Sequence, residues 1–113
     1  MKIEKFGVYL ADLGGRAGTE AGKVRPVVVI QTDLLNHVHP STVICPMTTH
    51  ITKEASVLRV RVSKTDGELQ KDSDIMVDQM RAIDNSRFLK RVGKLKSDQQ
   101  EKILENLRIL VLE

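Results

Sequence analysis

The chain has 113 residues, of which 41% are hydrophobic and 29% charged, and a formal net charge of +3 at pH 7. This length suits one domain with one core, expected over residues 1–113, and the charge permits a polyanionic partner without requiring one. The single cysteine, Cys45, excludes an intramolecular disulfide and a cysteine-based metal cage. The polar N-terminus and the lack of a long apolar run exclude a signal peptide and a membrane span, so we expect a soluble cytoplasmic protein.

Short apolar segments predict strands along most of the chain. Residues 24–31 form a β-branched run, typical of a strand that is covered on both faces. In residues 57–62, apolar side chains alternate with Arg59 and Arg61, which therefore face outward, either as a solvated surface or as a track for phosphates. The predicted strands cover residues 6–13, 24–31, 41–47, 57–62, 74–77 and 89–95.

The C-terminal segment predicts a helix. Residues 97–100, Ser-Asp-Gln-Gln, have the S-x-x-Q form of a capping box that opens at Ser97. Short strands followed by one amphipathic helix predict a mainly β fold, a small curled antiparallel sheet or barrel closed by the C-terminal helix. The apolar face of that helix is predicted to hold Ile103, Leu104, Leu107, Leu110 and Val111.

A glycine-rich loop at residues 14–23 leads directly into the second strand. Within it, residues 18–24 approach the phosphate-binding pattern G-x-x-x-x-G-K-[ST] but are one residue short. Val24 stands where Mg²⁺ requires a hydroxyl, and a strand follows where the phosphate requires a helix N-terminus. The loop is therefore not a nucleotide-binding P-loop.

Arg25 marks the point where this loop ends and the strand begins. A guanidinium held there by a rigid strand suits a phosphate. The alternative is an arginine at a sheet edge in a surface ion pair, with Pro26 blocking further pairing. Residues 46–50, Pro-Met-Thr-Thr-His, end another strand in hydroxyls that lie beside Arg25 if the two strands pair. The alternative role of Thr48 and Thr49 is hydrogen bonding in the turn.

The histidines and the cysteine indicate no metal centre. His37, His39 and His50 lack the i, i+4 spacing of a helical metal site, and the carboxylates form no metal-binding pattern. We therefore expect neither a metal nor a cofactor. Cys45 lies within an apolar strand and is expected to be a small buried hydrophobe rather than a nucleophile.

Four sequence blocks, spread over nearly the whole chain, carry a family resemblance. They read G-V-Y-L-A-D-L at residues 7–13, G-T-E-A-G-K-V-R-P-V-V-V-I at 18–30, V-I-C-P-M-T-T at 43–49 and V-D-Q-M-R-A-I-D at 77–84. In this order they resemble the MazF/PemK (Kid) toxins of bacterial toxin–antitoxin systems. The second block matches that family's signature G-[ST]-E-x-x-G-x-R-P, and the fourth its [DE]-Q-[IP]-R-[TA]-[IV]-D.

The resemblance implies an SH3-like, CcdB/MazF-like barrel, an obligate homodimer, and metal-independent, sequence-specific cleavage of single-stranded RNA by a growth-arresting toxin. Arg25 and Thr48 fall on the family's catalytic Arg and Ser/Thr, and Asp78 on an acidic position implicated in some members. Met76 stands where some members carry an arginine, so a mechanism built on that arginine does not transfer. The expected RNA-binding residues are Glu20, Thr49, Gln79, Arg81, Arg59 and Arg61.

Metal-free RNA cleavage suits these residues, because the ribose 2′-hydroxyl is the nucleophile and the enzyme need not supply one. Arg25 can stabilise the pentavalent phosphorane, and Thr48 can donate to a non-bridging oxygen. Asp78 is the natural base if it lies close enough. The expected products carry a 2′,3′-cyclic phosphate and a 5′-hydroxyl.

Two classes of partner remain open. A cognate antitoxin with an acidic, disordered segment is expected to order along the RNA groove and bury Arg25. The alternative function is a non-catalytic SH3-like barrel that binds a protein target such as gyrase, as the related CcdB fold does. That function needs neither Arg25 nor Thr48, so these two residues favour the nuclease.

Overall fold

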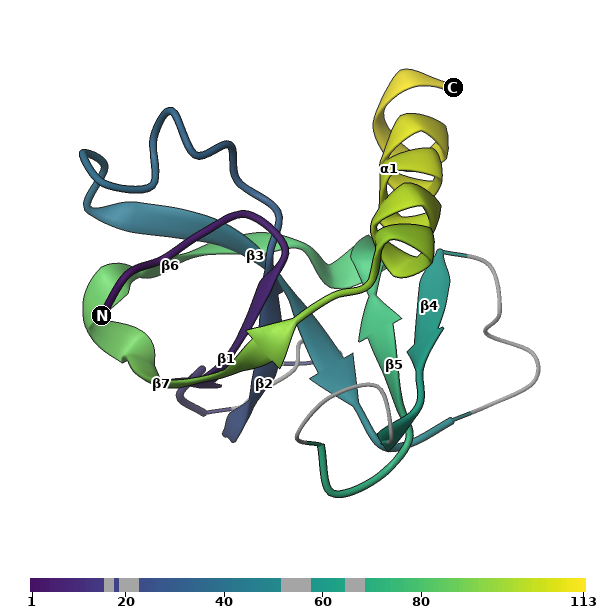
Figure 1. Cartoon of the computed structure of the whole chain (residues 1–113), viewed down its shortest axis with the longest axis horizontal. Coiled ribbons are helices and arrows are strands. Elements are labelled where there is room, and N and C mark those ends of the chain that lie inside the picture. Colours follow the sequence, from purple (N-terminus) through teal and green to yellow (C-terminus); the bar gives the residue numbers. More distant parts are fainter. Residues whose placement is uncertain (16–17, 19–22, 52–57, 65–68) are drawn as a thin grey trace.

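The computed structural model describes residues 1–15, 18, 23–51, 58–64 and 69–113. Within these residues no helix has the length and apolar character needed to cross a membrane. The elements, shown in Figure 1, are β1 (Gly7–Asp12), β2 (Val24–Val29), β3 (Ser41–Thr48), β4 (Arg59–Val62), β5 (Ser73–Met76), the 3-10 helix η2 (Val77–Gln79), β6 (Arg81–Asp84), the 3-10 helix η3 (Asn85–Arg87), β7 (Phe88–Lys94) and α1 (Ser97–Leu112).

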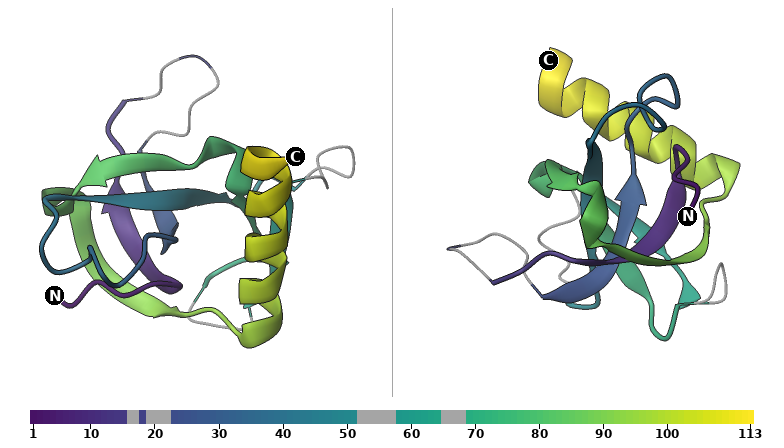
Figure 2. Two further views of the ribbon diagram at one scale, coloured as in Figure 1. Left: turned by 90° about the horizontal axis from the view of Figure 1, so that it is seen from above. Right: turned by 90° about the vertical axis from the view of Figure 1, so that its left-hand side faces the viewer.

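One seven-stranded antiparallel sheet forms the body of the protein. Its strand order is β4-β5-β3-β2-β1-β7, and β6 pairs with β3 outside this path. The long strand β3 pairs with β6 through residues 41–44 and with β5 through Met47 and Thr48, so it changes partner part-way along. Figure 2 shows the strands curling into a small barrel with α1 along one side. The expected mainly β fold with a C-terminal helix is confirmed.

Both faces of the central strands are buried. Val27 and Val29 of β2 belong to a first core and Val28 to a second, because successive side chains of a strand point to opposite faces. Helix α1 packs beside β4 and η2 and closes the second core through Ile103, which is fully buried. The continuous apolar run of β2 therefore serves two cores at once.

The sequence does not predict β6 or η2. Only Ile83 is buried in the β6 sequence Arg-Ala-Ile-Asp, so no apolar run marks this strand. The cap of α1 lies one residue earlier than expected: the N-cap is Lys96, whose backbone N–H donates to Oε1 of Gln99 at 3.0 Å. The predicted apolar face is also only partly covered, since Leu104 and Val111 are 47% and 59% exposed.

Tyr9 joins the N-terminal segment to the first core. Its side chain is fully buried, and its ring meets the Phe88 ring edge-on with the centroids 5.4 Å apart. The hydroxyl donates to the Lys2 carbonyl at 2.9 Å and accepts the Glu4 N–H at 3.0 Å. A Cβ at position 7 would lie 2.7 Å from the Tyr9 ring, which explains the glycine there.

We expect Gly7→Ala to destabilise the fold by about 1–3 kcal/mol, because the added methyl group overlaps a buried ring that is held by its core contacts. Gly93→Ala is the matched control, since it adds the same methyl group to β7 with no atom within 4 Å of it. Urea denaturation of both variants measures the difference in the free energy of unfolding. Equal stability of the two variants would contradict the close approach at Gly7.

Candidate active site

The shared end of β2 and β3 forms the site. Val27 pairs with Pro46, and Arg25 and Thr48 each stand two residues further along their strands. Nη1 of Arg25 donates to the Met47 carbonyl at 3.3 Å, so the guanidinium lies against the end of β3. Strand β2 lies between β1 and β3, and Arg25 pairs with Ala11 of β1, whereas the pairing of β2 with β3 covers Val27–Val29.

The Thr48 hydroxyl already accepts one hydrogen bond. Its Oγ1 accepts the His50 N–H at 3.1 Å, so the predicted turn hydrogen bond exists. A hydroxyl donates independently of what it accepts, and the Thr48 O–H therefore retains the ability to donate to a ligand. Thr48 is half-buried, whereas Thr49 and His50 are exposed.

The backbone fixes the base of the glycine-rich loop. The Leu13 N–H donates to the Lys23 carbonyl at 2.9 Å, and the Lys23 N–H donates to the Gly14 carbonyl at 2.6 Å. Gly14 has a φ of 76° and Lys23 one of 64°, the left-handed conformation that turns the chain here. These contacts hold the start of β2 and with it Arg25. The predicted RNA-binding residue Glu20 lies outside the described residues.

A row of polar residues crosses four neighbouring strands at this end of the sheet. Thr48 pairs with Asp74 of β5, and Asp74 pairs with Arg61 of β4. Since paired residues on neighbouring strands project to the same face, these side chains and that of Arg25 share one face. The term polar row is used below for Arg25, Thr48, Asp74 and Arg61.

The sequence prediction misses Asp74, which it treats as the first residue of an apolar strand. In the structure this side chain is only 6% exposed, and its Oδ1 accepts from Nε of Arg61 at 2.7 Å. The available signal was a carboxylate within Ser-Asp-Ile-Met, a strand in which every residue is buried. Since a buried carboxylate needs a charged partner, the arginines of the adjacent strand were the candidates.

Asp78 lies in η2, beyond the polar row, and its nearest charged partner among the described residues is Arg59. Oδ1 of Asp78 is 4.0 Å from Nε of Arg59, and the Asp78 side chain is 42% exposed. The Arg59 side chain is only 17% exposed, whereas that of Arg61 is 55% exposed. Both arginines project from the face of β4 opposite the buried Val60 and Val62, as expected, but Arg61 is exposed to solvent whereas Arg59 is largely covered.

The other predicted RNA-binding residues occupy separate positions. Gln79 is half-buried in η2, beside Asp78. Arg81 opens β6 and pairs with Ile44, four residues before Thr48 on β3. The structure thus brings Arg25 and Thr48 together at one end of β3, and it places Arg81 near the middle of the same strand.

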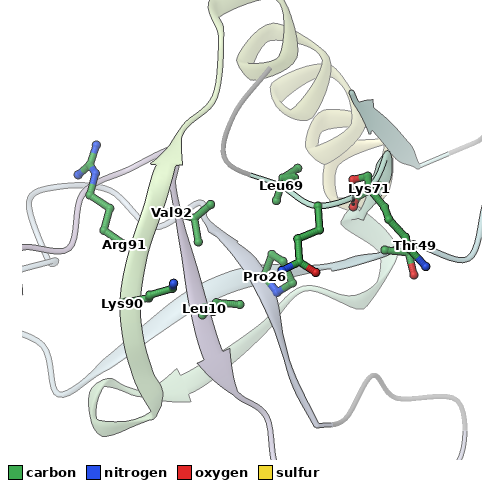
Figure 3. A pocket seen from close by; sticks show the side chains of 10 residues that line it. Leu10, Pro26, Thr49, Leu69, Lys71, Lys90, Arg91 and Val92 are labelled. Atoms are coloured by element: carbon green, nitrogen blue, oxygen red, sulfur yellow. Dashed lines mark hydrogen bonds between the residues drawn. The ribbon is translucent and has the colours of Figure 1, made fainter. Parts of the chain in front are cut away.

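A cavity of about 400 Å³ lies behind the polar row. Pro26 lines it, and because Pro26 follows Arg25 in the strand, the two side chains point to opposite faces of β2. Figure 3 shows Leu10, Leu69 and Val92 around the cavity, with the guanidinium of Arg91 pointing away. Thr49, expected to bind RNA, is among the lining residues. The cavity and the polar row therefore share two strands but open on different faces.

The histidines of the described segments lie at the surface. His37, His39 and His50 are all exposed, and Nδ1 of His39 lies 3.2 Å from the Ser41 hydroxyl. Across residues 1–15, 18, 23–51, 58–64 and 69–113, no three His, Cys, Asp or Glu side chains are grouped so that they could hold a metal ion.

Comparison with known proteins decides the family. Residues 4–111 match the family model described as "PemK-like, MazF-like toxin of type II toxin-antitoxin system". The chain belongs to this family. A relative among curated proteins, Endoribonuclease EndoA of Bacillus subtilis (strain 168), is 33% identical over 109 residues, covering 96% of this chain and 94% of the relative.

Solved structures share the fold. MazF (Form-I) from Deinococcus radiodurans has a TM-score of 0.82 at 20% identity, with 98% of this chain and 97% of that chain covered. A structure titled "Endoribonuclease in complex with its cognate antitoxin from Mycobacterial species" has a TM-score of 0.79 at 18% identity, with the same coverage. The CcdB/MazF-like barrel expected from the sequence is confirmed.

Cys45 of this MazF/PemK-like toxin is placed in the second core and away from the solvent. It is fully buried on β3 opposite Val28. Burial, with a smaller contribution from the charge of Asp78, raises the pKa of the Cys45 thiol to about 12. The thiol therefore stays protonated at neutral pH, as expected of a buried hydrophobe.

We expect the native toxin to resist alkylation of Cys45 by iodoacetamide at pH 8, since both the burial of the thiol and its raised pKa suppress the reactive thiolate. Mass spectrometry should find no adduct on the native protein and one adduct after unfolding in guanidinium chloride. Rapid modification of the native protein would show that the thiol is accessible.

Proposed function

We propose that this MazF/PemK-like toxin, as one domain over residues 1–113, is a metal-independent, sequence-specific endoribonuclease that cleaves single-stranded RNA. The observation that carries the proposal is the placement of Arg25 and Thr48 on one face, at adjoining ends of two paired strands. A guanidinium and a hydroxyl there provide two donors for the oxygens of one phosphate. The 33% identity to a relative named an endoribonuclease supports the same chemistry.

The reaction is an internal transesterification. The ribose 2′-oxygen attacks the neighbouring phosphorus as its proton passes to a base, and the bond from phosphorus to the 5′-oxygen breaks as that oxygen takes up a proton. Arg25 stabilises the negative charge of the phosphorane, and Thr48 donates to a non-bridging oxygen. The products carry a 2′,3′-cyclic phosphate and a 5′-hydroxyl.

Asp78 is proposed as the carboxylate that accepts the 2′-hydroxyl proton. It lies in η2, which directly follows β5, the strand that pairs with Thr48, and its side chain is 42% exposed, with Arg59 beside it. Gln79 and Arg81 extend the RNA surface beyond Asp78, while Thr49 and Glu20 are proposed to contact the RNA at the end where Arg25 lies.

The toxin is proposed to act in the cytoplasm as a homodimer that a cognate antitoxin inhibits. The last turns of α1 leave Leu112 76% exposed and Val111 59% exposed, apolar surface of the kind that a partner subunit can cover. An acidic antitoxin segment is proposed to bind over Arg25 and exclude RNA. Antitoxin complexes are known for proteins with the same fold.

The alternative of a non-catalytic barrel that binds a protein such as gyrase is less well supported. It gives no role to the joint placement of Arg25 and Thr48, and the family model and the curated relative both favour the toxin nuclease.

We expect Arg25→Ala and Thr48→Val each to lower the cleavage rate of single-stranded RNA by roughly a hundredfold or more, because each removes a donor to the phosphorane. Both variants should keep the fold and lose the ability to arrest growth. A gel assay with a long RNA and circular dichroism measure the two properties.

Two substitutions provide matched controls. Arg108→Ala removes an arginine from the exposed side of α1, and Thr32→Val removes a hydroxyl that accepts a turn N–H, that of Leu34, just as Thr48 does. Both should cleave at the wild-type rate. Wild-type cleavage by Arg25→Ala would refute the assignment of the site.

We expect cleavage to continue unchanged in excess EDTA, because the mechanism uses only side-chain donors and a carboxylate. Wild-type toxin and a long RNA, incubated with and without EDTA, should give the same fragments, and their 5′ ends should accept phosphate from a kinase without prior phosphatase treatment. Loss of cleavage in EDTA would overturn the metal-independent mechanism.

A further inference from the structure

Asp74 is a buried carboxylate that the proposed reaction does not use. Only 6% of its side chain is exposed, and it sits in β5 between Thr48 of β3 and Arg61 of β4. A buried charge is costly unless a charged partner neutralises it. Arg61 is that partner, through a hydrogen bond from Nε to Oδ1 of 2.7 Å.

This contact fixes the direction of the Arg61 guanidinium. The anchoring bond is made through Nε, while 55% of the Arg61 side chain is exposed. The planar guanidinium is therefore held at Nε by a buried carboxylate, and its two terminal nitrogens lie at the exposed end of the side chain. An arginine that is ordered before its ligand arrives loses less conformational entropy on binding, and so binds more tightly.

The Arg59–Asp78 contact does not provide the same anchor. Its separation of 4.0 Å exceeds hydrogen-bond length, the carboxylate is 42% exposed, and the arginine is the more buried partner. Here the exposed end of the pair is negative. Of these two ion pairs of the described residues, that of Arg61 turns an anchored cation toward the solvent, whereas that of Arg59 does not.

Arg61 also lies far enough from Thr48 to contact a different phosphate from the one that is cleaved. Neighbouring strands lie about 4.8 Å apart, so Arg61, two strands away from Thr48, is about 10 Å from it between backbones. The polar row begins with Arg25 and ends with Arg61, and both project to one face. An RNA strand that runs along the polar row therefore brings a flanking phosphate to Arg61.

We propose that Asp74 is a positioning residue, which holds Arg61 to bind an RNA phosphate that flanks the cleaved one. The inference rests on the proposed nuclease function, and it adds to the expected RNA contact of Arg61 a residue that holds Arg61 in place. Asp74 itself does not touch the RNA. It acts through Arg61, and the contact contributes to substrate binding rather than to the chemical step.

The substitution Asp74→Asn separates positioning from simple electrostatics, because the two predict opposite signs. Removing a negative charge near a polyanion should tighten RNA binding if charge alone matters. Loss of the anchor should instead raise KM roughly three- to tenfold, with kcat retained, because Arg25 and Thr48 remain in place. The assay uses an RNA oligonucleotide whose cleavage site has been mapped by 5′-end sequencing.

Arg61→Lys and Arg61→Gln complete the test. Arg61→Lys keeps the charge but lacks Nε, and it should raise KM as Asp74→Asn does, which keeps the inference testable if Asp74→Asn does not fold. For Arg61→Gln, the slope of log Kd against log salt should fall by about 0.7, measured on the oligonucleotide with a 2′-methoxy group at the cleaved nucleotide. Adding Asp74→Asn to Arg61→Gln should cause no further loss. Arg108→Gln, which removes an exposed charge of α1 that lies outside the polar row, should leave KM unchanged.

The outcomes distinguish the two proposals. A wild-type protein that does not cleave RNA overturns the proposed function and this inference with it. A wild-type protein that cleaves, together with an unchanged or lower KM for folded Asp74→Asn or an unchanged KM for Arg61→Lys, overturns the inference alone. A three- to tenfold fall in kcat at constant KM for Asp74→Asn would also overturn the inference, because it would place Asp74 in the chemical step.

Discussion

The pairing of β2 with β3 is the contact on which the site depends. Its register, with Val27 opposite Pro46, brings Arg25 to the end of β3, and the resulting hydrogen bond to Met47 spans 22 positions of the sequence. Val27, Val28 and Val29 are all fully buried, so both faces of the paired strands β2 and β3 pack against a core. A slip of one residue would move every side chain of a strand to the other face, and the two cores therefore fix the register.

The polar row shows how the pairing of strands can order charged side chains. Arg25 and Arg61 stand at its two ends and Asp74 lies buried between Arg61 and Thr48, so the exposed parts of the row are cationic and its anionic part is covered. Donors held by paired strands need little reorganisation when a phosphate gains charge. The cavity lies on the opposite face of β2 and is therefore separate from this arrangement.

Local patterns predicted most of the architecture because strand alternation is a local property of the sequence. They failed for β6, where a single buried residue, Ile83, leaves no pattern to detect. For the site, the resemblance supplied Arg25, Thr48 and Asp78, but the part played by Asp74 depends on which strand lies next to β5. Such pairings follow from the packing of the whole barrel, and no single segment encodes them. The one-residue shift of the α1 cap to Lys96 has a more local cause, since Gln99 reaches the Lys96 N–H.

The polar row also has a consequence for the order in which a newly made chain acquires activity. Its members come from β2, β3, β4 and β5, and the core behind them is closed only by α1 at the C-terminus. Contacts between distant parts of the sequence form late in folding, because a long loop must close first. A chain still emerging from the ribosome thus has Arg25 and Thr48 long before it has the barrel that aligns them. The order of synthesis therefore delays the alignment of the polar row until α1 is also available to fold.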